Sequence, residues 1–204
     1  AYKALLLNGF RFVPKYTMNI NTPPISVNGD ELADKLKNIS NSDILKIEQL
    51  LAELKIKECI KQGLIKDKTI VYTQYVEGIV PMLRNEIESL GLNVNCYTGN
   101  ESEEQRKEII NDFINGSLNV LIGSKPISTG VDGLQKVCNN MIVISAPWTN
   151  AEYHQLIKRI YRQGSLFKDV DVIIPKVYID KWSWDERRIE IIEHKKTLGE
   201  AVLD

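Results

Sequence analysis

Short β-branched runs alternate with helical segments through most of this chain, and this alternation constrains its fold more than any other feature. Stretches with helical periodicity separate most of the runs, which occupy residues 69–73, 94–97, 120–122, 141–144 and 170–177. Successive strand–helix–strand units place their strands in parallel, because each helix carries the chain back to the edge where the first strand began. The pattern predicts an α/β fold, with a mostly parallel sheet covered by helices on both faces.

Capping residues mark the ends of two helices. A long amphipathic helix is predicted from residue 43, with Ser42 as its N-cap, Gly63 as its stop, and an apolar stripe made of Ile44, Ile47, Leu51 and Leu54. Another helix is predicted from Ser102 to Gly116, because Gln105 completes a capping box with Ser102. The first helix lies directly before the β-branched runs, and the second lies between two of them.

The two ends of the chain differ from its middle. The first part has weak periodicity and a pair of adjacent prolines, so it is predicted to be mostly irregular, with one short helix at most. The last part begins with a second capping box, Ser183 with Glu186, and is predicted to form a closing helix. The predicted parts are a lead-in at 1–41, an α/β domain at 42–180 and a C-terminal helix at 181–204.

Charge and hydropathy narrow the classes of function. The net charge of −1 and the pI near 6.2 provide no global attraction to a polyanion, so any nucleic-acid contact must come from a local surface. No apolar run approaches the ~20 residues that a membrane span requires. We therefore expect a soluble protein, cytoplasmic or nucleoid-associated, with no membrane partner. Because the chain begins at Ala1 rather than at methionine, we also expect a piece of a longer protein.

The cysteines do not indicate a cross-linked or metal-binding protein. They are three in number, they lie far apart at Cys59, Cys96 and Cys138, and they show no Cys-x-x-Cys spacing. Disulfide frameworks and zinc sites need paired cysteines at short spacings. We predict reduced thiols and no metal site.

The segment 120–135, VLIGSKPISTGVDGLQ, is an apolar strand that runs into a loop rich in Ser, Thr and Gly and containing Asp132. Ligands of parallel α/β sheets bind at the carboxyl ends of strands, and such loops expose N–H groups and hydroxyls that suit phosphates. The alternative is a tight connection between a strand and a helix, in which Gly130 and Gly133 are needed for a positive φ. The loop by itself leaves both interpretations open.

Residues 146–164 carry a regularly spaced polar set. Gln155, Arg159 and Arg162 are four and three positions apart, so on a helix they would share one face and could reach a common target. A solvated basic face is the alternative interpretation. It does not explain the ordered Gln-x-x-x-Arg-x-x-Arg-x-Gly pattern.

Together these segments resemble the carboxy-terminal lobe of superfamily 2 helicases, and most closely that of the Swi/Snf-type DNA translocases. The order and spacing of the matching blocks make the combination specific. In chain order the blocks are motif IV at 68–79, a Thr-Gly block at 97–113, motif V at 123–135, motif VI at 154–165 and a brace helix at 180–204. The resemblance implies a RecA-like sheet.

The resemblance also implies roles for individual residues. Arg162 would be the arginine finger that reaches the γ-phosphate, with Arg159 beside it; such a finger raises the rate of GTPases by roughly 10³ to 10⁵. Gln155, Gly130 and Asp132 would lie on the nucleotide side of motifs VI and V. The residues that would contact the backbone of nucleic acid, without reading its sequence, are Thr73, Gln74, Thr98, Gly99, Ser124 and Lys125.

Three stretches depart from the patterns of these motifs. Lys158 replaces the glycine that is common in motif VI, although Swi/Snf-type members often carry a polar residue there. Motif V has Ser128, Thr129 and Gly130 where those translocases usually have two or three glycines. The Trp-Thr-Asn at 148–150 replaces their Trp-Asn-Pro. These departures concern the subfamily rather than the superfamily.

The chain lacks the sequences that hold the phosphates and the metal ion of ATP. It contains no Gly-x-x-x-x-Gly-Lys-Ser/Thr and no Asp-Glu-x-His or Asp-Glu-Ala-Asp run. We expect ATP and Mg²⁺ to be held mainly by an N-terminal RecA-like lobe of the parent protein. The parent would be an ATP hydrolase that acts on nucleic acid, in particular double-stranded DNA. We expect the isolated chain to be inactive, without a cofactor.

Two other functions fit parts of the pattern. A stand-alone Rossmann-like nucleotide-binding enzyme would use the same sheet, although Gly-x-Gly-x-x-Gly is absent and the arginines stay unexplained. A non-catalytic nucleic-acid-binding module would use the polar loop ends, although the net charge offers no basic stripe.

Overall fold

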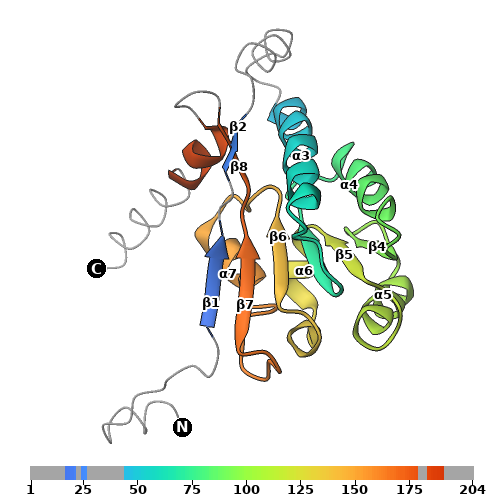
Figure 1. Ribbon diagram of the computed structural model, residues 1–204. Coiled ribbons are helices and arrows are strands. Elements are labelled where there is room, and N and C mark those ends of the chain that lie inside the picture. Colours follow the sequence, from blue (N-terminus) through green and yellow to red (C-terminus); the bar gives the residue numbers. More distant parts are fainter. Residues whose placement is uncertain (1–16, 22–23, 27–43, 179–182, 191–204) are drawn as a thin grey trace, which may run out of the picture.

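A parallel sheet forms the centre of the molecule (Figure 1). The computed structural model describes residues 17–21, 24–26, 44–178 and 183–190. The six strands of the main sheet lie in the order β1-β7-β6-β3-β5-β4, and every pair is parallel. Their bounds are β1 (Thr17–Asn21), β3 (Thr69–Tyr72), β4 (Val94–Tyr97), β5 (Val120–Gly123), β6 (Asn140–Val143) and β7 (Asp169–Ile173). A separate parallel pair consists of β2 (Pro24–Ser26) and β8 (Lys176–Tyr178).

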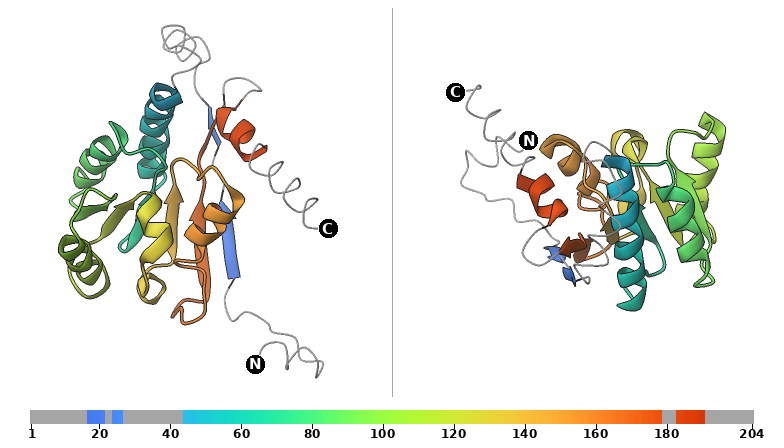
Figure 2. Two further views of the ribbon diagram at one scale, coloured as in Figure 1. Left: turned by 180° about the vertical axis from the view of Figure 1, so that it is seen from behind. Right: turned by 90° about the horizontal axis from the view of Figure 1, so that it is seen from above.

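Helices cover both faces of the main sheet (Figure 2), which confirms the predicted α/β class. Side chains alternate along each strand, so Ile70 and Tyr72 enter one core while Val71 enters the other. The helices are α3 (Ile44–Lys61) and α4 (Ile79–Glu88) on the Val71 side, and α5 (Glu103–Asn115), α6 (Lys125–Gly130) and α7 (Asn150–Ile157) on the other. A 3₁₀ turn, η1 (Leu134–Lys136), follows α6, and residues 184–190 form the last helical segment. None of the helices in the described ranges is long and apolar enough to cross a membrane.

Helix α3 has the predicted extent but a different buried face. Gly63 adopts a φ of +66° just after the helix, which fits its predicted role as the stop. Three residues of the predicted apolar stripe, Ile47, Leu51 and Leu54, pack on the small β2–β8 pair, whereas the main core takes Ala52, Ile56 and Cys59. The helix also buries Glu48 and Lys55, which the hydropathy pattern could not anticipate. The predicted N-cap, Ser42, lies outside the described residues.

The two predicted capping boxes have different outcomes. At the start of α5, Ser102 Oγ accepts from Gln105 N at 3.2 Å and Gln105 Oε1 accepts from Ser102 N at 2.8 Å, so this box is confirmed. At Ser183 only half of the box forms, with Ser183 Oγ accepting from Glu186 N at 3.4 Å. The carboxylate of Glu186 instead accepts from the Tyr178 hydroxyl at 2.5 Å, because β8 lies within its reach.

Two strands of the lead-in were not predicted, and one predicted strand is wrong. The lead-in contains β1 and β2, since Thr17–Asn21 pairs in register with Asp169–Ile173 and so extends the main sheet. Five residues beside a proline pair give too weak a signal for a strand whose partner lies far along the chain. The predicted run 170–177 is two strands in two sheets, because Pro175 lacks the N–H that a continuous strand would need.

Candidate nucleotide and nucleic-acid interface

Arg159 lies in the turn after α7 and is bonded to the far end of α6. Its Nε and Nη2 donate to the Ser128 carbonyl at 3.1 and 2.7 Å, and its Nη1 donates to the Val131 carbonyl at 2.8 Å. The last carbonyls of a helix have no partner within that helix, and hydrogen bonds from a charged donor are stronger than neutral ones. Arg159 therefore fixes the end of α6 and the turn that leads to Asp132.

Arg162 reaches the same turn but is held more loosely. Its Nη1 lies 2.5 Å from Asp132 Oδ1, and the Nη1 of Arg159 lies 3.9 Å from the same oxygen. The side chains of Arg162 and Asp132 are 40% and 81% exposed. Water screens so exposed an ion pair, so exchanging Asp132 for another anion costs little free energy.

A basic hollow lies beside this ion pair. It has a volume of about 410 Å³ and is lined by Lys158, Arg159, Tyr161 and Arg162. Guanidinium forks bind phosphate oxygens in a bidentate geometry, and an ammonium group adds a point charge. The hollow thus has the charge and the donors that a phosphate group requires.

The predicted common helical face of Gln155, Arg159 and Arg162 is wrong. Helix α7 ends at Ile157, and the backbone continues in turns in which Arg159 N donates to the Leu156 carbonyl at 3.0 Å. The bonds of Arg159 to α6 hold the chain in these turns. The two guanidinium groups meet at Asp132 because of this turn, while Gln155 stays exposed on α7.

The glycines of motif V do not all have the predicted role. Gly133 adopts a φ of +95°, as predicted, but Gly130 has no positive φ and its missing Cβ would meet no atom within 4 Å. Gly123 was overlooked: a Cβ there would lie 2.8 Å from Ile127 Cδ1. This glycine lets α6 pack directly over the end of β5.

The residues predicted to contact nucleic acid gather at one edge of the sheet. They follow the carboxyl ends of β3, β5 and β4, which are neighbours. Two of the connections are direct, since Ser124 Oγ donates to the Thr98 carbonyl at 3.0 Å and Gln74 N donates to Ser145 Oγ at 2.8 Å. The six predicted residues thus lie together at one edge, and Ser145 and Glu101 bond to them there; we call this set the strand-end edge (Thr73, Gln74, Thr98, Gly99, Glu101, Ser124, Lys125 and Ser145).

Members of the strand-end edge differ in exposure. Thr73 and Ser124 are buried, and their hydroxyls donate to the carbonyls of Tyr75 and Thr98. These two side chains stabilise the loops. Lys125 and Gly99 are exposed, with the ammonium group of Lys125 at 3.2 Å from a carboxylate oxygen of Glu152.

A carboxylate occupies the predicted backbone-binding position at the Thr-Gly pair. Glu101 accepts from Thr98 N, Gly99 N and Thr98 Oγ1, each at 2.9 Å. Burial alone would raise the pKa of Glu101, but the hydrogen bonds from the two N–H groups lower it. The Thr98–Gly99 backbone is thus a built anion site that holds an anion of the chain itself.

Two residues of the edge escaped the sequence-based prediction. Ser145 directly follows the predicted strand 141–144, so its position at a strand end was a usable signal. Glu101 gave no signal, because its role depends on the side chain folding back onto the preceding residues.

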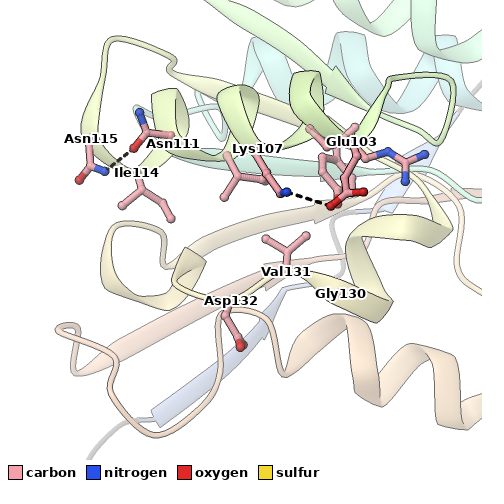
Figure 3. Close-up of a pocket in the computed structure, with 11 residues that line it drawn as sticks. Glu103, Lys107, Asn111, Ile114, Asn115, Gly130, Val131 and Asp132 are labelled. Atoms are coloured by element: carbon pink, nitrogen blue, oxygen red, sulfur yellow. Dashed lines mark hydrogen bonds and ion pairs between the residues drawn. The ribbon is translucent and has the colours of Figure 1, made fainter.

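A second cavity lies on the other side of Asp132. Its volume is about 460 Å³, and it separates α5 from the turn at 130–132. Figure 3 shows Val131 pointing toward α5, whereas the side chain of Asp132 extends away from that helix. Within this cavity Lys107 pairs with Glu103 at 2.8 Å. The carboxylate of Asp132 therefore belongs to the arginine side of the turn.

Solved structures of helicase lobes share this fold. The C-terminal part of the Fun30 ATPase domain matches with a TM-score of 0.54 and 16% identity, over 80% of this chain and 44% of that one. The C-terminal domain of the DEAD-box protein Dbp5 matches with a TM-score of 0.52 and 21% identity, over 89% of this chain and 86% of that one. The S. cerevisiae Dbp5 domain bound to Gle1 and IP6 matches with a TM-score of 0.52 and 17% identity, over the same shares.

Sequence comparison gives the family. No curated protein sequence is significantly similar to this chain. The model of the helicase conserved C-terminal domain matches residues 46–164, which is more than half of the chain and includes the arginines, motif V and the strand-end edge. The chain therefore belongs to the helicase conserved C-terminal domain family, with a RecA-like fold.

Proposed function

We propose that this chain is the C-terminal lobe of an ATP-dependent nucleic-acid translocase or helicase. In that protein it supplies an arginine finger and part of the track for nucleic acid. The observation that carries the proposal is the half-exposed guanidinium of Arg162 beside a basic hollow, held only by the exposed Asp132 among the described residues. A group held this way can turn to a phosphate that another lobe presents.

The hydrogen bonds of Arg159 and Arg162 suggest different roles for the two arginines. Arg159 is bonded to backbone carbonyls of α6, so it positions the motif V turn and contributes charge to the hollow. Arg162 is the group that stabilises the negative charge that develops on the transferred phosphoryl. Asp132 holds Arg162 until the lobes close and then contacts the ribose or the lobe interface. Gln155 and Gly130 belong to the same side of the site.

ATP and Mg²⁺ would be held mainly by the N-terminal RecA-like lobe. The hollow fits the phosphate end of the nucleotide because it offers three cationic side chains. Across the described ranges, no group of three or more His, Cys, Asp or Glu residues could hold a metal ion. Because the N-terminal lobe would hold the nucleotide and the metal ion, we expect the isolated chain to be inactive.

The strand-end edge would form part of the nucleic-acid track. Lys125 suits phosphodiesters, and so do the N–H groups of Thr98 and Gly99 once Glu101 is displaced; contacts of this type position a strand without reading its sequence. The resemblance to Swi/Snf-type translocases favours double-stranded DNA as the substrate, and a cytoplasmic or nucleoid-associated location. Stimulation of ATP hydrolysis by duplex DNA but not by single-stranded RNA would separate this subfamily from the DEAD-box type.

The test uses the longer protein that contains both lobes, and compares Arg162→Ala with Arg84→Ala. Arg84 is a matched control, because it is 46% exposed and has one i,i+4 partner, Glu88, at 2.7 Å on a helix of the other sheet face. We expect the Arg162 variant to lose duplex-stimulated ATPase activity by about 10³-fold or more. The Arg84 variant should keep the wild-type rate.

Equal stimulated rates for the Arg162 variant and the wild type would remove the proposed finger. Tight nucleotide binding or activity of the isolated chain would instead favour a stand-alone Rossmann-like enzyme. Salt-sensitive nucleic-acid binding without arginine-dependent ATPase activity would favour a non-catalytic binding module.

A further inference from the structure

The helical segment 184–190 is attached to α3 by a buried ion pair. Arg188 Nη1 donates to Glu48 Oε1 at 3.0 Å, and the two residues are only 3% and 2% exposed. The indole N–H of Trp184 donates to the same oxygen at 3.0 Å. A buried charge is costly unless it is paired, so this geometry specifies where Arg188 must lie.

Arg188 also contacts the loop that follows β6. Its Nη2 donates to the Ala146 carbonyl at 2.6 Å, and its guanidinium carbon lies 4.1 Å from the centroid of the Trp148 ring. The Tyr75 ring lies edge-on to Trp148, with centroids 6.5 Å apart and an interplanar angle of 89°. One guanidinium therefore bonds a carbonyl and lies over an aromatic face, as its planar form permits.

The residues held by Arg188 are continuous with the strand-end edge. Tyr75 follows Gln74, whose N–H donates to Ser145 Oγ at 2.8 Å. Ser145 in turn precedes the loop that carries Trp148, and Thr149 caps the start of α7 through a bond from Glu152 N. Helix α7 then leads to the turn with the candidate finger.

We propose that Arg188 is a positioning residue for nucleic-acid engagement. By fixing Trp148 and the Ala146 carbonyl it sets the loop between β6 and α7, and so the edge that meets the phosphodiester backbone. The inference rests on the proposed function, since it assigns a role within the same track. A lysine would keep the charge but not the planar stacking, so Arg188→Lys should fail at this task.

The chain offers a matched control on the same helix pair. Lys55 pairs with Asp185, and its ammonium group donates to the Ile144 carbonyl at 2.8 Å, while Asp185 accepts from Val177 N at 2.9 Å. This buried pair also ties 184–190 to α3. Among the described residues it reaches the segment after β6 at the Ile144 carbonyl, and it has no hydrogen bond or cation–π contact with Trp148.

The experiment compares wild type, Glu48→Met/Arg188→Met, Arg188→Lys and the control Lys55→Met/Asp185→Asn in the two-lobe protein. Each double variant removes both charges, which avoids an unpaired buried ion. Thermal unfolding checks that each variant folds. The readout is the duplex DNA concentration that gives half-maximal stimulation of ATPase activity, set against the unstimulated rate and the KM for ATP.

We expect the Glu48/Arg188 variant to need about fivefold more duplex or more, with Arg188→Lys close behind it. The unstimulated rate and the KM for ATP should stay within about twofold. The control should lower Tm without moving the duplex requirement.

Three results would overturn the inference. One is an unchanged duplex requirement in a folded Glu48/Arg188 variant, and another is an equal shift in the control. If the double variant does not fold, the Arg188→Lys variant serves as the test. The third result is an Arg188→Lys variant that needs no more duplex DNA than the wild type. A wild-type protein whose ATPase activity is stimulated by neither duplex DNA nor single-stranded RNA would instead remove the proposed function, which distinguishes the two failures.

Discussion

At the scale of single residues, two glycines of motif V make a matched pair. A Cβ at Gly123 would lie 2.8 and 2.9 Å from side-chain atoms of Ile127, which is fully buried and cannot give way. A Cβ at Gly130 would meet no atom within 4 Å. We expect Gly123→Ala to lower the free energy of unfolding by about 1–3 kcal/mol, and Gly130→Ala to be neutral or to add up to about 1 kcal/mol. Urea unfolding of the chain measures both, and equal stabilities would contradict the packing described here.

Glu101 provides a second prediction at this scale. Its carboxylate occupies the N–H groups of Thr98 and Gly99, so nucleic acid must displace it to use them. We expect Glu101→Gln to bind a short labelled duplex about threefold more tightly or better, because a neutral amide competes less strongly for the anion site. Fluorescence anisotropy at low salt measures the affinity.

The control for Glu101 is Glu104→Gln, which removes the same charge from the exposed first turn of α5. A gain shared equally by both variants would mean that only net charge matters. No gain in either would mean that the Thr98–Gly99 backbone is not part of the track.

The roles of these residues were only partly visible in the sequence. The resemblance to motifs V and VI implied that Asp132, Arg159 and Arg162 lie on the nucleotide side of one site, and they meet within hydrogen-bond or ion-pair distance. It did not predict that Arg159 bonds to carbonyls of α6. A contact of a side chain with a distant backbone depends on tertiary packing, which residue type and spacing do not encode.

At the scale of elements, the predictions succeeded where the local signals were strong. The strands β3, β5 and β6 are short apolar runs in which every residue is buried, and their burial follows from the parallel sheet itself. Strand β1 was missed because its five residues are mostly exposed at the sheet edge, so they carry little hydrophobic signal. The end of α7 at Ile157 was missed because contacts with α6, not a glycine or proline, terminate the helix.

The capping box at the start of α5 leads to a prediction about the stability of this helix. Ser102 Oγ satisfies the N–H of Gln105, which has no partner within the helix. We expect Ser102→Ala to destabilise the chain by about 1 kcal/mol, and Ser102→Thr by clearly less, since threonine keeps the hydroxyl. Urea midpoints of the variants and the wild type measure this difference. An alanine variant as stable as the wild type would show that the box does not contribute.

At the scale of the whole molecule, α6 joins the two candidate surfaces. It begins beside Ser124 on the strand-end edge, and Arg159 holds its other end. Six helical residues span only about 9 Å, so a displacement at one end is passed directly to the other. A lobe with this arrangement can couple the binding of a nucleic-acid strand at the strand-end edge to the position of Arg162.

The stability of the whole molecule should fall in alkali because two thiols are buried. Burial raises the pKa of Cys59 and of Cys138 to about 12, from an ordinary value of 9.0. Above pH 9 the unfolded chain therefore loses these protons while the folded chain keeps them, so the free energy of unfolding decreases as the pH rises. Each thiol should account for a loss of about 1 kcal/mol between pH 9 and pH 10. The raised pKa of Cys96 and that of Tyr72 add to this loss, the tyrosine mostly above its ordinary pKa of 10.0.

Urea unfolding of the wild type and of Cys138→Ala at pH 8, 9 and 10 measures this effect. The comparison uses the slope of stability against pH, because the substitution also leaves a small cavity that lowers stability at every pH. The variant should lose about 1 kcal/mol less stability than the wild type between pH 9 and pH 10, since one buried thiol is gone. Its Cys59 should still resist alkylation at pH 9 until the chain unfolds, because the thiolate is the reactive form. A wild-type stability that is flat or rising between pH 9 and pH 10 would show that these thiols ionise without unfolding, which is incompatible with the packing of α3 and η1 onto the sheet.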